Sequence, residues 1–560
     1  TFNFNANSTF KNNISGGNGN DVFNFRAMPI FEANDNVQGN DGDDIFNFIE
    51  FGGSFATVPQ LFGGSGNDMW NFGPSTPDVS LGQSLEGGTG GDRVVFTGYT
   101  KGAPIINDVE NIDVINGADL KVNYTTPIVT GTGPGAGLFI DSTSRMMAAN
   151  INGDVKNDGT IYFPFSVPTT REVDNFDSSG IVDMRNGHTE DVFYVKGDAS
   201  GNYKVFMEVF LDANYSGDAH FIEGNKTGVT VLNITNLGAL GVESGTGNTD
   251  GLSVAQVAGN ANAGSFVLEG EYVLDGPYKY FLNPFAPGQS AESQRKVGAA
   301  GTGFWDYRLQ SNGTLVEQIN FYKLTTSAAL DYNWMVMDEL HQRLGQIEDL
   351  DNSSIVTQAK DAKGAVGAGG EAFARVKTLN GNFQSKSQSI KDLKFHQNTK
   401  FLQAGMNVLS GTNIAGDNLR VGFGLSYGRN TLKNYLGKME LSGPSVALYG
   451  TYQSHKGFYL DNVLQASFFN ADYKLRNRGK MASTNGVGYG FSVEGGYTYQ
   501  PNNKVKVQPQ LQLGYQHTKF GSFTDKDGFD VLKMRAEGVR GRAGVRLSYE
   551  EMAHHMRGEA

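Results

Sequence analysis

The first hundred residues contain four gapless copies of one segment: Gly16-Gly-Asn-Gly-Asn-Asp21-Val-Phe-Asn-Phe25, Gly39-Asn-Asp-Gly-Asp-Asp44-Ile-Phe-Asn-Phe48, Gly63-Gly-Ser-Gly-Asn-Asp68-Met-Trp-Asn-Phe72 and Gly87-Gly-Thr-Gly-Gly-Asp92-Arg-Val-Val-Phe96. The copies begin at residues 16, 39, 63 and 87, so the period is 23 or 24 residues. A fixed period of this length is typical of stacked supersecondary units. In each copy the glycines supply the positive φ angles of a tight turn, and a short strand follows. One turn per rung predicts a parallel β-helix with neighbouring strands roughly 4.8 Å apart.

The strand in each copy carries apolar residues that can reach a shared core. We expect Val22 with Phe25, and Ile45 with Phe48, to face that core. The chain opens with Thr1-Phe-Asn-Phe4, which matches the end of the same unit, and it has no initial Met or signal segment. We therefore expect that a preceding turn is missing and that the chain is truncated at this end.

The aspartates of the repeated turns are a candidate calcium site. The turns resemble the calcium-binding nonapeptide of RTX-type β-rolls, and Ca²⁺ prefers carboxylate and carbonyl oxygens. Stacking predicts a column of carboxylates that would repel one another without a cation. The column consists of Asp21, Asp44, Asp68 and Asp92, with Asp41 beside it. The alternative is a solvated Asp capping each turn, because the motif occurs once per rung and the last copy contains Arg93 directly after Asp92. No cofactor is required by either interpretation.

The composition narrows the classes of function. At 560 residues the chain is too long for one ordinary domain. It has no cysteine, which excludes disulfides, thiol catalysis and Cys-ligated metals. Its formal net charge of −13 argues against a nucleic-acid partner. The sequence has no nucleophile elbow, zinc-binding helix motif or phosphate loop, so we expect no enzymatic activity in these residues.

From about residue 97 to 310 short strands continue between Gly, Asn and Asp turns. Several segments resemble, in content and order, the C-terminal passenger region of autotransporters, the bacterial type V secreted proteins. The clearest are Asn152-Gly-Asp-Val-Lys-Asn-Asp-Gly-Thr160, Gly228-Val-Thr-Val-Leu-Asn-Ile-Thr-Asn236 and Phe304-Trp-Asp-Tyr-Arg-Leu309. The resemblance implies a pertactin-like module that caps the β-helix and helps it to fold at the cell surface.

One long helix is predicted over residues 326–350, where apolar residues recur at spacings of three and four. Its apolar stripe includes Trp334, Met337 and Leu344. The pattern alone favours an ordinary amphipathic helix packed on a sheet. However, Asp338-Glu-Leu-His-Gln-Arg-Leu-Gly345 resembles the segment just before the autotransporter barrel, which implies a helix that threads the barrel pore. A linker of small residues follows at 364–370.

After residue 371 the hydrophobic pattern alternates with a period of two, as in membrane β-strands. Eight strands are predicted, at about 371–378, 400–410, 418–428, 444–454, 457–469, 486–499, 504–517 and 537–549. One face is apolar and suits lipid, and the other suits a polar lumen. We expect the lumen to contain Arg375, Arg420, Arg540, Arg542 and Arg546.

The stretch Val539-Arg-Gly-Arg-Ala-Gly-Val-Arg-Leu547 resembles the autotransporter translocator. That barrel has twelve strands, so about eight of twelve are expected here and the chain would be truncated at this end too. A closed barrel of eight strands has room only for its own side chains. We therefore expect that these strands alone could not close a pore around the helix.

Together these patterns predict an all-β chain: a parallel β-helix passenger, a short α-helix and a partial antiparallel transmembrane β-barrel. The expected parts are the repeat region at 1–130, the capping region at 131–325, the pore helix and linker at 326–370, and the barrel at 371–560. The resemblance implies an autotransporter that exports its own passenger and anchors it at the cell surface through the outer membrane. It also implies outer-membrane lipid and the barrel assembly machinery as partners.

For the passenger we expect adhesion or surface display, because long solenoids present extended binding surfaces. Its ligand is not indicated by the sequence. Two alternatives remain open. One is an autotransporter with an enzymatic, hydrolase passenger upstream of Thr1. The other is a soluble, secreted, RTX-like calcium-binding protein, which leaves the alternating pattern after residue 371 unexplained.

Overall fold

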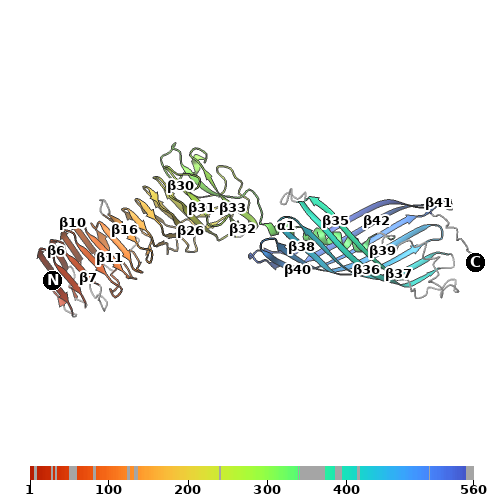
Figure 1. Cartoon of the computed structure of the whole chain (residues 1–560), viewed down its shortest axis with the longest axis horizontal. Helices are drawn as coiled ribbons and strands as arrows, with labels where there is room; N and C mark the ends of the chain where they lie inside the picture. Colours follow the sequence, from red (N-terminus) through yellow and green to blue (C-terminus); the bar gives the residue numbers. More distant parts are fainter. Residues whose placement is uncertain are drawn as a thin grey trace, which may run out of the picture. The chain divides into compact units, whose positions relative to one another are not determined.

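The computed structural model describes residues 1–5, 9–26, 30–31, 35–48, 60–79, 84–122, 127–130, 136–212, 214–238, 241–338, 340, 372–384, 394–412, 416–502 and 505–549. The chain divides into two compact units, Thr1–Thr314 and Leu315–Ala560. Figure 1 shows stacked strands in the first unit and a curved sheet in the second. The predicted all-β fold with a short helical segment is confirmed.

The first unit is a parallel β-solenoid, as the repeats predict. Its longest sheet contains β1 (Phe2–Phe4), β4 (Val22–Phe25), β7 (Ile45–Phe48), β9 (Met69–Phe72), β11 (Arg93–Thr97), β13 (Asn111–Ile115), β16 (Gly137–Ile140), β19 (Val155–Asn157), β22 (Phe176–Ser178) and β25 (Ala199–Ser200). All neighbours in this sheet are parallel. Each strand therefore belongs to a successive rung.

Further sheets complete the rungs. The second contains β3 (Ile14–Asn18), β6 (Asn36–Asp41), β8 (Gln60–Ser65), β10 (Ser84–Thr89) and β12 (Ile105–Asn107). The third contains β14 (Asp119–Leu120), β17 (Arg145–Met147), β20 (Thr160–Tyr162), β23 (Ile181–Asp183), β26 (Tyr203–Phe210), β29 (Thr230–Asn236) and β31 (Phe266–Leu268), with β27 (Ser216–Gly217) at its edge. A short pair joins β2 (Thr9–Phe10) and β5 (Ile30–Phe31).

The interior of the first rungs consists of two columns of stacked aromatic rings. One column contains Phe2, Phe23, Phe46 and Trp70, with successive ring centroids 4.8, 4.8 and 5.2 Å apart. The other contains Phe4, Phe25, Phe48, Phe72 and Phe96, with centroids 4.6, 4.3, 5.0 and 5.1 Å apart. Each rung thus places its rings directly on those of the rung before it.

Of the residues predicted to face the core of these strands, the phenylalanines do so and the aliphatic residues do not. Phe25 and Phe48 are buried, but Val22 and Ile45 are only half-buried and point away from the interior. The reason is the period of two in a strand, which puts residues three apart on opposite faces. Phe23 shares the inner face with Phe25 instead.

The solenoid ends in antiparallel strands. The fourth sheet contains β15 (Ile128–Val129), β18 (Ile151–Asn152), β21 (Thr170–Val173), β24 (Val192–Val195), β28 (Ala219–Ile222), β30 (Leu252–Val257), β34 (Trp305–Gln310), β33 (Tyr278–Phe285) and β32 (Val273–Asp275). β28 and β30 are parallel, whereas β34 is antiparallel to both β30 and β33. A 3₁₀ turn, η1 (Glu292–Gln294), lies in the connection between β33 and β34.

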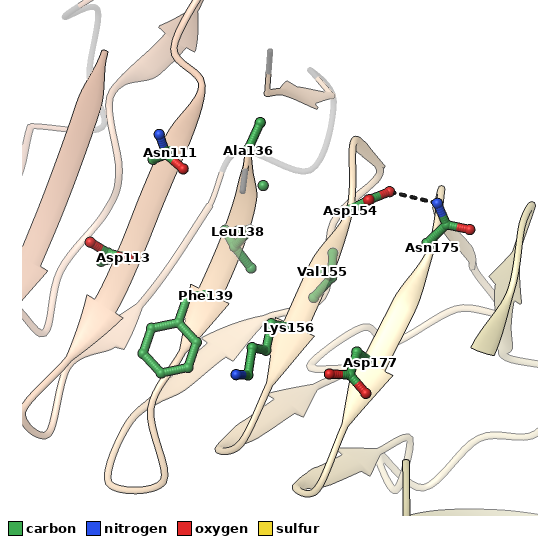
Figure 2. A pocket seen from close by; sticks show the side chains of 11 residues that line it. Asn111, Asp113, Ala136, Leu138, Phe139, Asp154, Val155, Lys156, Asn175 and Asp177 are labelled. Atoms are coloured by element: carbon green, nitrogen blue, oxygen red, sulfur yellow. Dashed lines mark hydrogen bonds between the residues drawn. The ribbon is translucent and has the colours of Figure 1, made fainter. Parts of the chain in front are cut away.

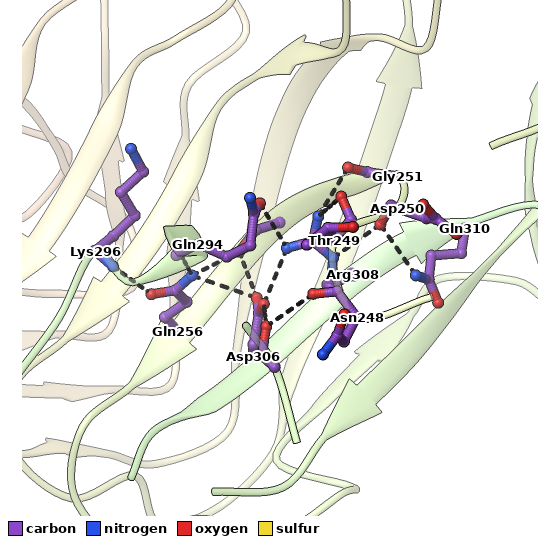
Figure 3. A network of polar contacts seen from close by, with 12 residues as sticks. Asn248, Thr249, Asp250, Gly251, Gln256, Gln294, Lys296, Asp306, Arg308 and Gln310 are labelled. Carbon is purple, nitrogen blue, oxygen red and sulfur yellow. Dashed lines mark hydrogen bonds and ion pairs between the residues drawn. The ribbon is translucent and has the colours of Figure 1, made fainter. Parts of the chain in front are cut away.

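A buried ion pair fastens this antiparallel end (Figure 3). Arg308 and Asp306 are both almost inaccessible to solvent and lie 3.0 Å apart. The Arg308 guanidinium also donates to the carbonyls of Thr249, Asp250 and Gly251 at 3.2, 2.9 and 3.0 Å. Because all its donor groups face acceptors, the charge is compensated despite its burial.

The second unit is an antiparallel sheet that curves around a helix. Its main strands are β35 (Ala372–Gln384), β36 (Lys394–Thr412), β37 (Asn418–Lys433), β38 (Gly437–Gln453), β39 (Phe458–Leu475), β40 (Gly479–Tyr497), β42 (Val505–Phe520) and β45 (Met534–Tyr549). They pair in chain order, and β41 (Tyr499–Asn502) extends the edge of β42. The pair β43 (Phe523–Thr524) and β44 (Asp530–Val531) lies between β42 and β45. All eight predicted strands are present, and most are longer than predicted.

The helical segment differs from its predicted range. It consists of α1 (Glu317–Tyr322) and α2 (Thr325–Met337). α2 ends at Met337 because Asp338 has φ +40°, outside the helical region. The predicted continuation over 341–350, with Leu344, and the linker at 364–370 lie outside the described residues. In the part of the chain that the structure describes, no helix has the length and apolar character needed to cross a membrane.

Candidate functional site

The two faces of the curved sheet in the second unit have opposite chemistry. On the convex face, Leu425, Leu513 and Leu547 are 59, 60 and 73% exposed. On the concave face Gln403 and Gln512 are buried. Leucines exposed on several strands of one face would be unfavourable in water, whereas lipid matches them. The sheet is therefore built for an apolar surrounding and a polar interior.

Helix α2 occupies the concave side of this sheet, as Figure 1 shows. The fit depends on glycines in the strands. A Cβ atom at Gly428 would lie 2.4 Å from the Tyr332 ring, and one at Gly514 would lie 2.5 Å from the Trp334 ring. The Tyr332 hydroxyl donates to the Gly443 carbonyl at 3.2 Å. Trp334, predicted for the pore helix, is thus packed against the sheet.

The C-terminal end of α2 is held by charges. The Asp338 carboxylate lies 3.0 Å from the Arg375 guanidinium and 2.7 Å from the Lys377 ammonium group. Arg375 also donates to the carbonyls of Met335 and Val336 at 3.0 and 3.3 Å. These carbonyls belong to the last turn of the helix, where positive charge is favourable. We call Asp338, Arg375 and Lys377 the helix clamp.

The other arginines predicted for the lumen lie on β37 and β45. Arg540 lies over the Trp334 ring, 4.7 Å from its centroid. Arg542 donates to Glu494 at 3.2 Å, and Glu494 also accepts from the Tyr459 hydroxyl at 2.7 Å. The even-numbered positions of β45 also include Arg546, which is half-buried. On β37, Arg420 is 4% exposed. Met337, the other described residue predicted for the helix stripe, is fully buried.

The acidic partners in this site are not predicted by the alternation of residues in the strands. Neither Asp338 nor Glu494 was proposed as a lumen residue. A signal was present for Glu494, because it is an isolated carboxylate on the polar face of an alternating strand. Asp338 begins the stretch that resembles the segment before the barrel, but its role in the lumen depends on where α2 ends.

The N-terminal end of the helical segment is held by uncharged donors. Gln318 donates to Asp527 at 2.9 Å, and Tyr322 donates to Asp525 at 2.9 Å. Thr325 and Tyr473 share a hydrogen bond of 2.7 Å. Both aspartates lie in the connection between β42 and β45, so this connection covers α1.

The aspartates of the repeats form a ladder of hydrogen bonds in the solenoid. Asp44 accepts from the backbone N–H of Asp21 at 2.7 Å. Asp68 accepts from that of Asp44, and Asp92 from that of Asp68, both at 2.8 Å. Asp41 lies apart and accepts from the Ser65 hydroxyl at 2.7 Å. The carboxylates thus stack as predicted from the period, and each caps the preceding turn.

The second oxygen of each carboxylate in the ladder lacks a hydrogen-bond partner. This holds for Oδ2 of Asp44, Asp68 and Asp92, which are all buried. Burial raises the pKa of Asp68 to about 7 and that of Asp92 to about 6, and it also raises the pKa of Asp44. Within the described ranges, no three acidic or histidine side chains surround a common metal position. Calcium binding here stays a prediction.

The outer surface of the solenoid has a groove of about 420 Å³ across β13, β16, β19 and β22 (Figure 2). The groove lies at Gly137, which pairs with Asn111 of the neighbouring strand. Gly137 has no side chain to fill the outer surface at this position. Phe139 forms part of its wall, and the Lys156 ammonium group lies 5.8 Å from the centre of that ring. Asp154 accepts from Asn175 at 2.8 Å beside it. The groove therefore offers an aromatic ring, amides and both signs of charge.

The fold and its site define a class of protein: a β-solenoid followed by a helix that sits inside a lipid-compatible antiparallel β-domain. The family described as Autotransporter beta-domain matches residues 378–556. The chain is 25% identical over 362 residues to the adhesin BmaC autotransporter of Brucella suis biovar 1, covering 58% of this chain and 10% of that protein. It is 22% identical over 476 residues to the probable autotransporter YfaL of Escherichia coli K12, covering 80% of this chain and 36% of that protein.

A crystal structure of the β-domain of the Bordetella autotransporter BrkA matches 33% of this chain and 72% of that one, with 21% identity and a TM-score of 0.29. The chain spans well under half the length of either relative above. The family match and the two relatives identify it as an autotransporter with a C-terminal β-domain, which confirms the resemblance noted in the sequence. Its β-domain is of the outer-membrane type, and the solenoid precedes it in the chain, as a passenger does.

Proposed function

We propose that the β-domain carries the solenoid to the cell surface and anchors it there, and that the solenoid acts in adhesion rather than catalysis. The observation that carries this proposal is the helix clamp. It fixes the segment that leads out of the solenoid inside a sheet whose outer face is apolar. Because the solenoid and the β-domain belong to one chain, holding this segment inside the sheet anchors the solenoid to the membrane.

The concave face supports the export step. Its buried side chains include amides and hydroxyls such as Gln403, Gln512 and Ser445 beside the apolar groups that pack on the helix, so an extended chain in transit would find hydrogen-bond partners there. Outside, each new rung of the solenoid would bury its aromatic rings on the preceding rung. Folding would then favour outward movement without nucleotide. We include the barrel assembly machinery as a partner because the β-domain must be inserted into the membrane.

Adhesion is favoured over an enzymatic passenger by two observations. One relative is named an adhesin. The groove at Gly137 holds carboxylates beside an ammonium and a ring, an arrangement suited to binding through stacking and hydrogen bonds. The described solenoid surface also offers a long regular array rather than one deep pocket, which suits an extended ligand.

Surface display can be tested in bacteria that express the chain within its gene. Antibodies against the solenoid should bind intact cells, and external trypsin should remove that signal. Binding only after permeabilisation would contradict the export proposal. Adhesion should then be compared between Phe139→Ser, in the groove, and Ile105→Ser, a matched apolar surface change outside it. Adhesion that falls only in the groove variant supports the proposal, and equal adhesion of both variants excludes the groove.

A further inference from the structure

The convex face of the β-domain carries a band of cations near one rim. On five neighbouring strands, β36 to β40, outward-facing basic side chains lie beyond the apolar band. We call them the basic belt: Lys400, Arg429, Lys433, Lys438, Lys474 and Lys480. Four of the cross-strand pairs are cation to cation, namely Lys400 with Arg429, Lys433 with Lys438, Lys438 with Lys474, and Lys474 with Lys480.

Directly opposed like charges are unfavourable in a sheet, so the belt needs compensating anions. Only two carboxylates share its face on these strands as described, Glu440 and Asp472. Glu440 lies 3.1, 3.5 and 3.9 Å from three belt cations, and Asp472 lies 2.8 Å from Lys480. Lys400 and Lys433 have no hydrogen-bond or ion-pair partner in the described part of the chain. The belt therefore retains excess positive charge.

The position of the belt indicates what could supply the missing anions. Exposed Leu402, Tyr427 and Phe468 lie next to it on the same face, in the part of the surface that suits lipid. The belt also lies at the rim where α1 packs, because Tyr473, beside Lys474, packs edge to face with Tyr322. The cations thus lie where the apolar band ends, at the depth of lipid headgroups.

The opposite rim is different. Its outward side chains at the strand ends include Tyr452, Phe458 and Tyr497, which are 37, 44 and 49% exposed. These aromatic residues suit an uncharged interface. The two rims of one sheet thus present different chemistry to the two leaflets of a membrane.

We propose that the basic belt binds the phosphate groups of anionic lipids in the leaflet on the α1 side. This inference rests on the proposed function, because it requires that the β-domain lies in a membrane. Phosphate oxygens would accept from the lysines and from Arg429, and would relieve the repulsion between neighbouring cations. The lipid tails would at the same time cover the adjacent apolar band.

The test reconstitutes the full chain into vesicles of equal parts phosphatidylcholine and phosphatidylglycerol. Spin-labelled lipids of each kind then report which headgroup is enriched at the protein surface. The variant Lys433→Gln/Lys438→Gln/Lys474→Gln removes three belt charges. The matched control Lys121→Gln/Lys196→Gln/Lys204→Gln removes three exposed charges from the solenoid, outside the groove. If the belt triple variant does not insert, Lys400→Gln and Lys433→Gln are measured singly, because neither side chain has a described partner.

We expect enrichment of phosphatidylglycerol around the wild type and the control, and a loss of about tenfold in that preference in the belt variant. Equal preference in belt variant and control would overturn the inference, as would no preference in the wild type. Inorganic phosphate at 10-fold excess over lipid should leave the preference intact, and its abolition would show a site for free phosphate instead. A chain that does not enter vesicles at all would refute the proposed function rather than this inference.

Discussion

Replacing Asp68 by Asn should change the stability of the first rungs in a pH-dependent way. Asp68 is 1% exposed, and its Oδ1 accepts from the backbone of Asp44 while its Oδ2 has no partner. A Cβ atom placed on Gly63 would lie 2.2 Å from Oδ2 of Asp68 and 2.6 Å from the Gly87 carbonyl oxygen. The two oxygens are therefore neighbours beside Gly63. A protonated carboxyl group or an amide can direct a hydrogen toward that carbonyl, whereas a carboxylate cannot.

The magnitude follows from the pKa of Asp68, which burial raises from 3.8 to about 7. The folded state binds this proton more tightly than the unfolded state, so the stabilisation is complete below pH 3.8 and is lost as the pH rises through about 7. One pKa unit corresponds to about 1.4 kcal/mol, so the loss amounts to roughly 4 kcal/mol by pH 8. Asp68→Asn removes the charge, and it should therefore stabilise these rungs by up to about 4 kcal/mol at pH 8 but by only about 1.6 kcal/mol at pH 5, where little more than one pH unit separates the solution from the unfolded-state pKa.

The assay is urea unfolding of the full chain at both pH values, followed by the fluorescence of Trp70, which stacks on Phe46 in the same rungs. The control is Asp41→Asn, an exposed carboxylate in a neighbouring turn, which should shift stability by less than about 0.5 kcal/mol. Equal effects of Asp68→Asn at pH 5 and pH 8, or a destabilisation at pH 8, would refute the reasoning. If calcium neutralises the column, millimolar Ca²⁺ should stabilise the wild type at pH 8 and not the Asn variant.

Three other outcomes are expected. Arg308→Met should lower the stability of the antiparallel end of the solenoid by about 3–5 kcal/mol, measured by hydrogen exchange in β34, and adding Asp306→Leu should recover most of it. Gly514→Leu should prevent the β-domain from folding around α2, seen as loss of the heat-resistant compact form on gels, whereas Gly541→Leu, with open space around it, should fold normally. Asp338→Asn should loosen the helix clamp and speed hydrogen exchange of the backbone amides in the last turn of α2; unchanged exchange would show that packing alone holds the helix.

Much of the fold was predictable from two periodic patterns in the sequence. Such patterns indicate the type of element whatever the contacts of each side chain. The 23–24-residue repeat predicted stacked rungs, and the period of two after residue 371 predicted each strand of the β-domain. The strands extend beyond their apolar stretches, as in β39, which runs on from the predicted end at 469 to Leu475. These extensions carry polar residues beyond the apolar, lipid-facing part of the strand. The alternation of apolar residues therefore ends before the strand does.

Partners across the structure were less predictable, because a period assigns a residue to a face and not to a neighbour. Asn24, Asn47 and Asn71 form an amide ladder with contacts of 2.9 Å, which the sequence analysis did not identify. The alignment of the copies already placed these residues at one position. The helix clamp had no such signal, since Asp338 meets Arg375 only through the path of α2. Contacts between equivalent positions of successive copies thus follow from the sequence, whereas contacts between unlike elements do not.

The concave face of the β-domain explains how one structure can both release and hold a chain. An apolar interior would bind α2 tightly but would disfavour an extended polar segment in transit. A purely charged interior would admit the segment but would leave buried charges unpaired once it had passed. The observed face combines neutral hydrogen-bonding groups such as Gln403 and Gln512 with a few ion pairs at the helix end. The neutral groups accept any backbone, and the clamp selects the one segment that carries Asp338. Retention therefore depends on the clamp together with the apolar cluster around α2, which includes Phe401, Met439 and Phe469, while passage depends on the uncharged polar groups between them.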